Sequence, residues 1–204
     1  MTLVLMENCT KMYGDKEVLS NISFSLTSGM HFIKGDNGSG KSVLLRSVAT
    51  VEEFSSGNYK NKAKNILYLT DQSLTHHYLT IAENISLLYS IHKIVLTSKE
   101  EEIIKSFYTT DQLNTVSENA SLGMKLKVGC SLLAKQNHWD LVILDETFSG
   151  IDYSSRDLLL EICENLVKQG TCILVVSHNS LEREYLYKST VIELAEGRLV
   201  QNGK

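Results

Sequence analysis

The segment Gly35–Ser42, with the sequence Gly-Asp-Asn-Gly-Ser-Gly-Lys-Ser, constrains this chain more than any other. It matches the phosphate-binding pattern G-x-x-x-x-G-K-[ST] at every fixed position. The apolar run 30–33 in front of it is typical of a strand, and residues 43–49 behind it carry leucine and valine at helical spacing. A strand, a glycine loop and a helix are the context that the pattern needs. The sequence therefore predicts a phosphate-binding α/β fold.

The residue types of this loop suit the β- and γ-phosphates of a nucleotide. Glycine lets the backbone turn tightly and approach an anion, because no Cβ intervenes. The N–H groups of the loop and of the helix start then point at that anion. Lys41 adds a mobile positive charge, and the hydroxyl of Ser42 is a ligand for Mg²⁺. The predicted phosphate-binding residues are Gly35, Asp36, Asn37, Gly38, Ser39, Gly40, Lys41 and Ser42.

Composition limits the size, the partners and the location that we expect for this protein. The chain has 204 residues, of which 43% are apolar, which is enough for one sizeable domain or two small ones. Its net charge of -4 gives no electrostatic reason to expect nucleic acid as a partner. The four cysteines stand alone, no signal peptide opens the chain, and the apolar runs are too short to span a membrane. We therefore expect free thiols, a cytoplasmic location, and a membrane role only through a partner.

The first thirty residues have the pattern of antiparallel strands. Residues 2–6 alternate weakly, and 18–26 include a clear alternation of apolar and polar side chains. Tyr13 lies in a turn ahead of the glycine loop, where its aromatic face could stack on an adenine ring. Farther along, a polar turn is expected at 57–60 and a strand at 65–70.

Two capping boxes predict a helical insertion between about residues 73 and 135. Thr80 precedes Glu83 by three residues, and Ser98 precedes Glu101 by three. In each case apolar residues at helical spacing follow, and no strand separates the two helices. We therefore predict one domain over 1–204: a P-loop NTPase core with a mostly parallel sheet, an N-terminal antiparallel β subdomain and this small α-helical insertion.

The apolar runs 141–144 and 172–176 are expected to be buried parallel strands. A helix that begins at Asp152 connects them, and a β-hairpin with a glycine turn is expected at 191–200. Ligands in open α/β sheets bind beyond the carboxyl ends of the strands. Polar residues directly after these strands are therefore candidates for the site.

Such polar residues follow three of the predicted strands. They are Gln72, the pair Asp145-Glu146, and His178. Phosphoryl transfer needs a phosphate cradle, a metal ligand, a group that activates water and a group that senses the γ-phosphate. Together with Lys41 of the glycine loop, the ordered set therefore predicts a phosphoryl-transfer site.

With these residues the sequence resembles the ATP-binding subunit of ABC transporters over nearly its full length. The resemblance implies that Tyr13 contacts adenine, that Gln72 touches Mg²⁺ and faces the permease, and that Asp145 is the metal-linked aspartate. It also implies that Glu146 is the catalytic glutamate and His178 the switch histidine. The implied metal ligands are Ser42, Gln72 and Asp145, and the implied catalytic residues are Lys41, Gln72, Glu146 and His178.

Two stretches depart from the family pattern. The signature Ser-Gly-Gly-Gln, which reaches the ATP of the opposite subunit, corresponds to 121–125, where only Ser121 and Gly123 match. This variant is similar to those of export-type members and favours an exporter, with slower or asymmetric hydrolysis left open. Residues 149–152 resemble the loop that touches the second subunit. Thr147 stands where the family usually has proline, and we expect it to relax a loop without removing chemistry.

The resemblance implies a mechanism and a set of partners. Two such subunits, as a homodimer or a heterodimer, would sandwich two ATP molecules and power an integral-membrane permease from the cytoplasmic face of the membrane. The alternative is a soluble ABC-type ATPase that acts as an assembly or regulatory module without a permease. A GTPase or small-molecule kinase ranks lower, because 61–64, Asn-Lys-Ala-Lys, lacks the aspartate of the guanine-reading motif Asn-Lys-x-Asp. His76 and His77 are expected in an exposed loop.

Overall fold

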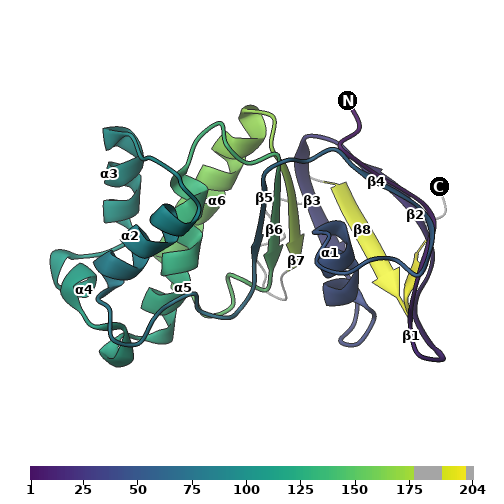
Figure 1. Cartoon of the computed structure of the whole chain (residues 1–204), viewed down its shortest axis with the longest axis horizontal. Helices are drawn as coiled ribbons and strands as arrows, with labels where there is room; N and C mark the ends of the chain where they lie inside the picture. Colours follow the sequence, from purple (N-terminus) through teal and green to yellow (C-terminus); the bar gives the residue numbers. More distant parts are fainter. Residues whose placement is uncertain (177–189, 201–204) are drawn as a thin grey trace. The chain divides into compact units, whose positions relative to one another are not determined.

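A computed structural model describes residues 1–176 and 190–200 of the chain (Figure 1). The chain divides into two compact units. The first unit comprises residues 1–68, 140–146 and 170–204, and the second comprises 69–139 and 147–169. Two β-sheets and one helix lie in the first unit, and the other described helices lie in the second.

The first unit contains an antiparallel sheet and a mostly parallel sheet, as the sequence predicts. The antiparallel sheet has the order β2 (Lys16–Leu26), β1 (Val4–Tyr13) and β4 (Ser56–Asn61). The second sheet has the order β5 (Ile66–Leu69), β6 (Leu141–Asp145), β7 (Cys172–Val176), β3 (Gly29–Lys34), β8 (Thr190–Ala195) and β9 (Arg198–Leu199). The pairs from β6 to β8 are parallel, and β8 and β9 form the expected antiparallel hairpin. Helix α1 spans Lys41–Val48.

The core of this unit explains why its central strands have no amphipathic alternation. Every residue of β6 and β7 is buried, as the two apolar runs predict. Buried side chains from both sheets and from α1 join in one hydrophobic cluster. Burial of apolar surface at roughly 25 cal/mol per Å² is the main force that holds such strands in place. The four cysteines are buried and their thiols are free.

The second unit consists of helices whose starts are set by side-chain caps. They are α2 (Ile81–Ile91), α3 (Ser98–Ser106), α4 (Thr110–Asn114), η1 (Ser117–Asn119), α5 (Leu122–Cys130), η2 (Ser131–Ala134) and α6 (Tyr153–Lys168). Capping boxes begin α2, α3 and α4. None of the helices within the described ranges is long and apolar enough to cross a membrane.

The sequence placed one of these caps correctly and one a residue too late. Thr80 caps α2, as predicted. Helix α3 is capped by Thr97 with Glu100, and the predicted box of Ser98 with Glu101 is wrong. The reason is tertiary: the buried Glu100 carboxylate also accepts from the Gln136 N–H and from Lys135, which fixes the register of the helix start.

The predicted polar turn at 57–60 is also wrong, because these residues belong to β4. The strand pairs with β1, and Tyr59 donates its hydroxyl to the Val48 carbonyl at 2.7 Å. Gly57 has a positive φ of 102°, and a Cβ there would lie 2.5 Å from the Asn8 carbonyl oxygen. Glycine therefore serves the close approach of two strands here and does not mark a turn.

Candidate functional site

The glycine loop joins β3 to α1 and has a backbone that glycine alone adopts freely. Gly35 has a φ of +149° and Gly40 a φ of +100°. A Cβ at Gly35 would lie 2.0 Å from the backbone oxygen of Leu194, and one at Gly40 would lie 2.9 Å from Cδ2 of Leu19. Both positions therefore need glycine for conformation and for space. A larger residue at either position would clash with the neighbouring residues Leu194 or Leu19.

Lys41 opens α1 and folds back over this loop. Its Nζ donates to the carbonyl oxygens of Gly35 at 2.8 Å and Asp36 at 2.9 Å. The N-cap is Gly40, and no side chain in the described part of the chain caps this helix end. The first-turn N–H groups and the ammonium therefore form a set of donors suited to an anion such as a phosphate.

A pocket of about 230 Å³ lies at the loop and brings several predicted residues together. Lys41, Ser42 and Glu146 all line it. Val18 of β2 lines it too and was not predicted. An apolar side chain such as Val18 does not indicate a binding site in a sequence. Only the tertiary fold brings β2 next to the glycine loop. The remaining lining residues are Asn37, Gly38, Gly40 and Val43.

Asp145 ends β6 and is held by a residue that the sequence analysis did not single out. The hydroxyl of Tyr68 donates to Asp145 Oδ2 at 3.1 Å. Burial, and then the nearby Asp145 charge, raise the pKa of Tyr68 well above its ordinary value, so the phenol stays protonated and remains a donor. Tyr68 lies on β5, the strand next to β6 in the sheet. The contact between Tyr68 and Asp145 could not be predicted, because the sequence does not reveal that β5 and β6 are neighbours.

Glu146 follows directly and has an unusual backbone. Its φ is +55°, a region that residues other than glycine rarely occupy. Its N–H donates to the Val176 carbonyl at 2.9 Å, at the end of the neighbouring strand β7. A strained conformation of this kind persists only where the surroundings fix it, and such positions gather at functional sites.

Comparison with known proteins identifies the class of this site. The family model described as ABC transporter matches residues 19–149, more than half of the chain. The chain belongs to the ABC transporter family. It is an ATP-binding cassette and thus an ABC-type ATPase, which confirms the resemblance seen in the sequence and the predicted fold class.

Relatives agree with this assignment, and a solved structure shares the fold. The chain is 31% identical to an uncharacterized ABC transporter ATP-binding protein of Methanocaldococcus jannaschii, over 98% of this chain and 77% of the relative. It is 30% identical to the linearmycin resistance ATP-binding protein of Bacillus subtilis, over 88% of this chain and 62% of the relative. A dimeric ATP-binding cassette described in a post-hydrolysis state with ADP and Pi matches its fold, with a TM-score of 0.79 at 20% identity and 98% coverage of both chains.

Other relatives are longer and are named for opposite directions of transport. A macrolide export ATP-binding/permease protein of Campylobacter jejuni is 25% identical over 99% of this chain, which spans 34% of that relative. A spermidine/putrescine import ATP-binding protein of Thermotoga maritima is 28% identical over 98% of this chain, which spans 58% of that relative. The family assignment therefore leaves the direction of transport open.

Tyr13 of the cassette ends β1 and is 45% exposed. Its hydroxyl donates to the carboxylate of Glu52, which also pairs with Arg46 and, at 3.5 Å, with Lys11. Lys11 Nζ lies 5.1 Å from the centre of the Tyr13 ring. The ring is thus held at its hydroxyl and on one side by charged neighbours of its own unit, which fixes its orientation.

The other predicted residues belong to the second unit or lie outside the described residues. Gln72 is exposed, and its N–H donates to Thr70 Oγ1 at 3.1 Å. Ser121 caps α5: its Oγ accepts the Met124 N–H at 3.2 Å. Gly123 lies against the 149–152 loop, where a Cβ would be 3.0 Å from the Gly150 oxygen. His76 and His77 are exposed, as expected, and His178 lies outside the described residues.

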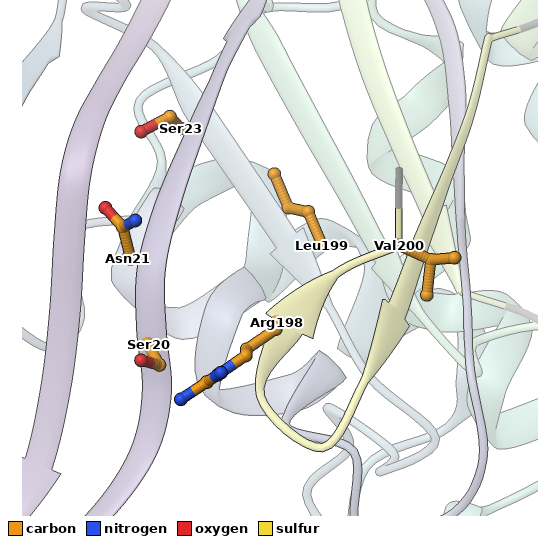
Figure 2. A pocket seen from close by; sticks show the side chains of 6 residues that line it. All are labelled: Ser20, Asn21, Ser23, Arg198, Leu199 and Val200. Atoms are coloured by element: carbon orange, nitrogen blue, oxygen red, sulfur yellow. The ribbon is translucent and has the colours of Figure 1, made fainter. Parts of the chain in front are cut away.

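A second pocket, of about 630 Å³, lies between β2 and β9 (Figure 2). Figure 2 shows the Arg198 side chain extending toward Ser20. The lining residues are Ser20, Asn21, Ser23, Arg198, Leu199 and Val200, and none of these is a predicted site residue of the cassette. Their side chains are exposed or half-buried, so the pocket is an open polar surface.

Proposed function

We propose that this cassette binds and hydrolyses Mg²⁺-ATP, pairs with a second ATP-binding subunit around the nucleotide, and powers a separate integral-membrane permease. One observation carries the proposal: Lys41, Ser42 and Glu146 line a single pocket at the glycine loop. A phosphate cradle, a metal-binding hydroxyl and a carboxylate able to activate water are the parts that phosphoryl transfer needs.

Lys41 and the loop amides bind the phosphates in this proposal. The Lys41 ammonium donates to two backbone carbonyls at the loop, and both of these acceptors are uncharged. A phosphate oxygen offers it a charge-assisted hydrogen bond, which is about twice as strong as a neutral one. The N–H groups in the first turn of α1 can add further donors to the same anion.

Mg²⁺, when bound, would neutralise the charge that develops on the phosphates. Ser42 and Asp145 supply the hydroxyl and carboxylate oxygens that suit it, and Gln72 is the third proposed ligand. The Tyr68 hydrogen bond holds one oxygen of Asp145 and so fixes the plane of its carboxylate. Tyr13 is proposed to stack on the adenine ring.

Glu146 is the proposed group that orients and deprotonates the attacking water, and His178 the group that positions that water against the γ-phosphate. A carboxylate in this role needs the water within hydrogen-bond reach. Its place beside Lys41 and Ser42 in the pocket lining supports the assignment.

Ser121 and Gly123 are proposed to reach the ATP of the second subunit. The start of α5 offers N–H groups, and the Ser121 hydroxyl can donate its own hydrogen while its oxygen accepts from Met124. The dimer described for a structurally similar cassette supports a second cassette as the partner. The partner cassette can be identical or different.

The permease would hold the cassette on the cytoplasmic face of the membrane and would determine the transported substance. We keep export as the predicted direction, and the relative named for linearmycin resistance supports it. Copurification with a multi-helix membrane protein, followed by transport assays in vesicles, tests this part. Recovery without any membrane protein would favour the alternative of a soluble assembly or regulatory module.

The variant Glu146→Gln tests the chemistry. We expect ATP affinity to be retained and phosphate release to fall by about 100-fold or more, the usual loss when a general base is removed. ATP-dependent dimers should then accumulate, as measured by light scattering after size-exclusion chromatography. Glu161→Gln, on the exposed side of α6, is the matched control. Hydrolysis by Glu146→Gln at the wild-type rate would refute the assigned role.

A further inference from the structure

Thr147 makes a buried hydrogen bond at the end of β6. It is 3% exposed, and its Oγ1 donates to the backbone carbonyl of Leu69 at 3.0 Å. Both residues belong to the second compact unit. The expectation that Thr147 relaxes the loop is therefore wrong, because the side chain is enclosed and bonded.

This bond lies between the two segments that carry proposed site residues. Thr147 directly follows Glu146, and Leu69 ends β5 three residues before Gln72. Strands β5 and β6 are neighbours in the sheet. The carboxyl ends of the two strands are thus joined by a side chain just beyond the last residue of β6.

A second side-chain bond joins the same strand ends, one residue earlier on β5 and two residues earlier on the β6 side. Tyr68, next to Leu69, donates to Asp145 at 3.1 Å. Asp145 and Thr147 therefore flank Glu146, and each is bonded to the end of β5. The residue between them has the strained φ of +55°. Neighbours fixed on both sides keep such a conformation from relaxing.

The side chain of threonine is suited to a hydrogen bond of fixed direction. Its branched Cβ restricts χ1, so the hydroxyl is held toward one acceptor. A proline, usual at this position in the family that the sequence resembles, offers no hydroxyl. The bond therefore depends on the hydroxyl that residue 147 supplies.

We infer that Thr147 is a positioning residue: its bond to Leu69 fixes the chain directly after Glu146 and so orients Glu146 for hydrolysis. The inference rests on the proposed function. The bond touches neither Lys41 nor the glycine loop, so its loss should leave ATP binding intact. A misplacement of about 1 Å in a reacting group can cost on the order of 100-fold in rate. The effect should therefore fall on kcat and spare KM.

The test compares Thr147→Val, which keeps the shape and removes the hydroxyl, with Thr147→Ser, which keeps the hydroxyl. We expect kcat for Mg²⁺-ATP to fall by about 10-fold in the valine variant, with the ATP Kd and KM within about twofold of wild type. The serine variant should recover most of the rate. Hydrogen exchange without nucleotide should increase at 69–73 and 146–149 in the valine variant alone.

Thr115→Val is the matched control in the same unit, because it removes another hydroxyl that donates to a backbone carbonyl, that of Asp111 at 2.8 Å. It should leave kcat unchanged. Wild-type kcat in Thr147→Val, or equal losses in the valine and serine variants, would overturn the inference. If Thr147→Val does not fold, Thr147→Ala decides by the same measurements, and failure of both to fold makes the bond structural and also overturns it.

Failure of this inference is distinct from failure of the proposed function. If Glu146→Gln stops turnover while Thr147→Val does not, the catalytic assignment stands and the positioning role is wrong. If Glu146→Gln turns over normally, the catalytic assignment is wrong and Thr147 has no reacting group to position.

Discussion

Three helix starts in this molecule are built in different ways. Helix α1 begins at Gly40 without a side-chain cap in the described part of the chain, and Lys41 lies over the loop. Helix α5 begins at Ser121, whose hydroxyl accepts the Met124 N–H. Helix α6 begins at Asp152, whose carboxylate accepts from the Ser155 N–H at 2.9 Å. The three starts thus range from uncapped, through a neutral cap, to a charged cap.

The difference shows which helix start leaves its donors for a ligand. The first four N–H groups of a helix have no partner inside the helix. At α6 the Asp152 carboxylate accepts one of them, the Ser155 N–H, and its charge suits the helix dipole. At α1 no side chain of the described residues caps the helix, and its N–H groups can donate to an anion. At α5 the serine oxygen is used, but its hydrogen remains available for donation.

The largest effect of a substitution at the three helix starts should be on ATP affinity, at the uncapped start of α1. Lys41→Ala removes the ammonium of the cradle, and a hydrogen bond to a charged group contributes about 1.5–3 kcal/mol. We therefore expect ATP affinity to fall by roughly 10- to 100-fold, measured by titration calorimetry with a nonhydrolysable analogue. Lys60→Ala on the exposed side of β4 is the control. Unchanged affinity in Lys41→Ala would contradict the phosphate-cradle assignment.

A smaller effect on stability should come from α5. Ser121→Ala removes its N-cap and should lower the free energy of unfolding by about 1 kcal/mol, measured with urea. Ser121→Asp keeps a good cap and has no hydroxyl hydrogen, so it should restore stability. If hydrolysis is also restored by Ser121→Asp, the hydroxyl is a cap only, and its proposed donation to ATP is wrong.

The smallest effect should come from the charge at α6. Hydrogen bonds hold the pKa of Asp152 below its usual range, the strongest from the Ser155 N–H and the next from the Ser154 hydroxyl. Lys127 Nζ also lies 3.6 Å from Asp152 Oδ2. Asp152→Asn keeps a cap without the charge and should cost about 0.5 kcal/mol near neutral pH.

The loss of unfolding free energy in Asp152→Asn should become smaller as the pH falls. Because the folded pKa of Asp152 is lowered, its stabilisation is fully present above the unfolded carboxyl pKa of about 3.9 and is lost as the pH falls below it. The difference in unfolding free energy between wild type and Asp152→Asn should therefore shrink from pH 7 to pH 3. A difference that grows on acidification would contradict the assigned charge effect.

Some features could be predicted because a short segment determines them. The glycine loop, the buried strand before Asp145 and the cap at Thr80 depend on local spacing or continuous apolar runs. Gly57 and Ser98 were misassigned because strand pairing and the burial of Glu100 overrode equally good local patterns. A turn glycine and a glycine at a close strand approach look the same in a sequence.

The sequence by itself determined the chemistry at the glycine loop, because positive φ and a missing Cβ are local demands that glycine alone meets. It also determined the class of the protein, through the order of polar residues after apolar runs. Only the tertiary structure decided which side chains support that chemistry. Tyr68 meets Asp145, and Thr147 meets Leu69, because β5 and β6 are adjacent in the sheet though 71 or more residues separate them along the chain. Strand order arises from packing of the whole core, so no short segment encodes it.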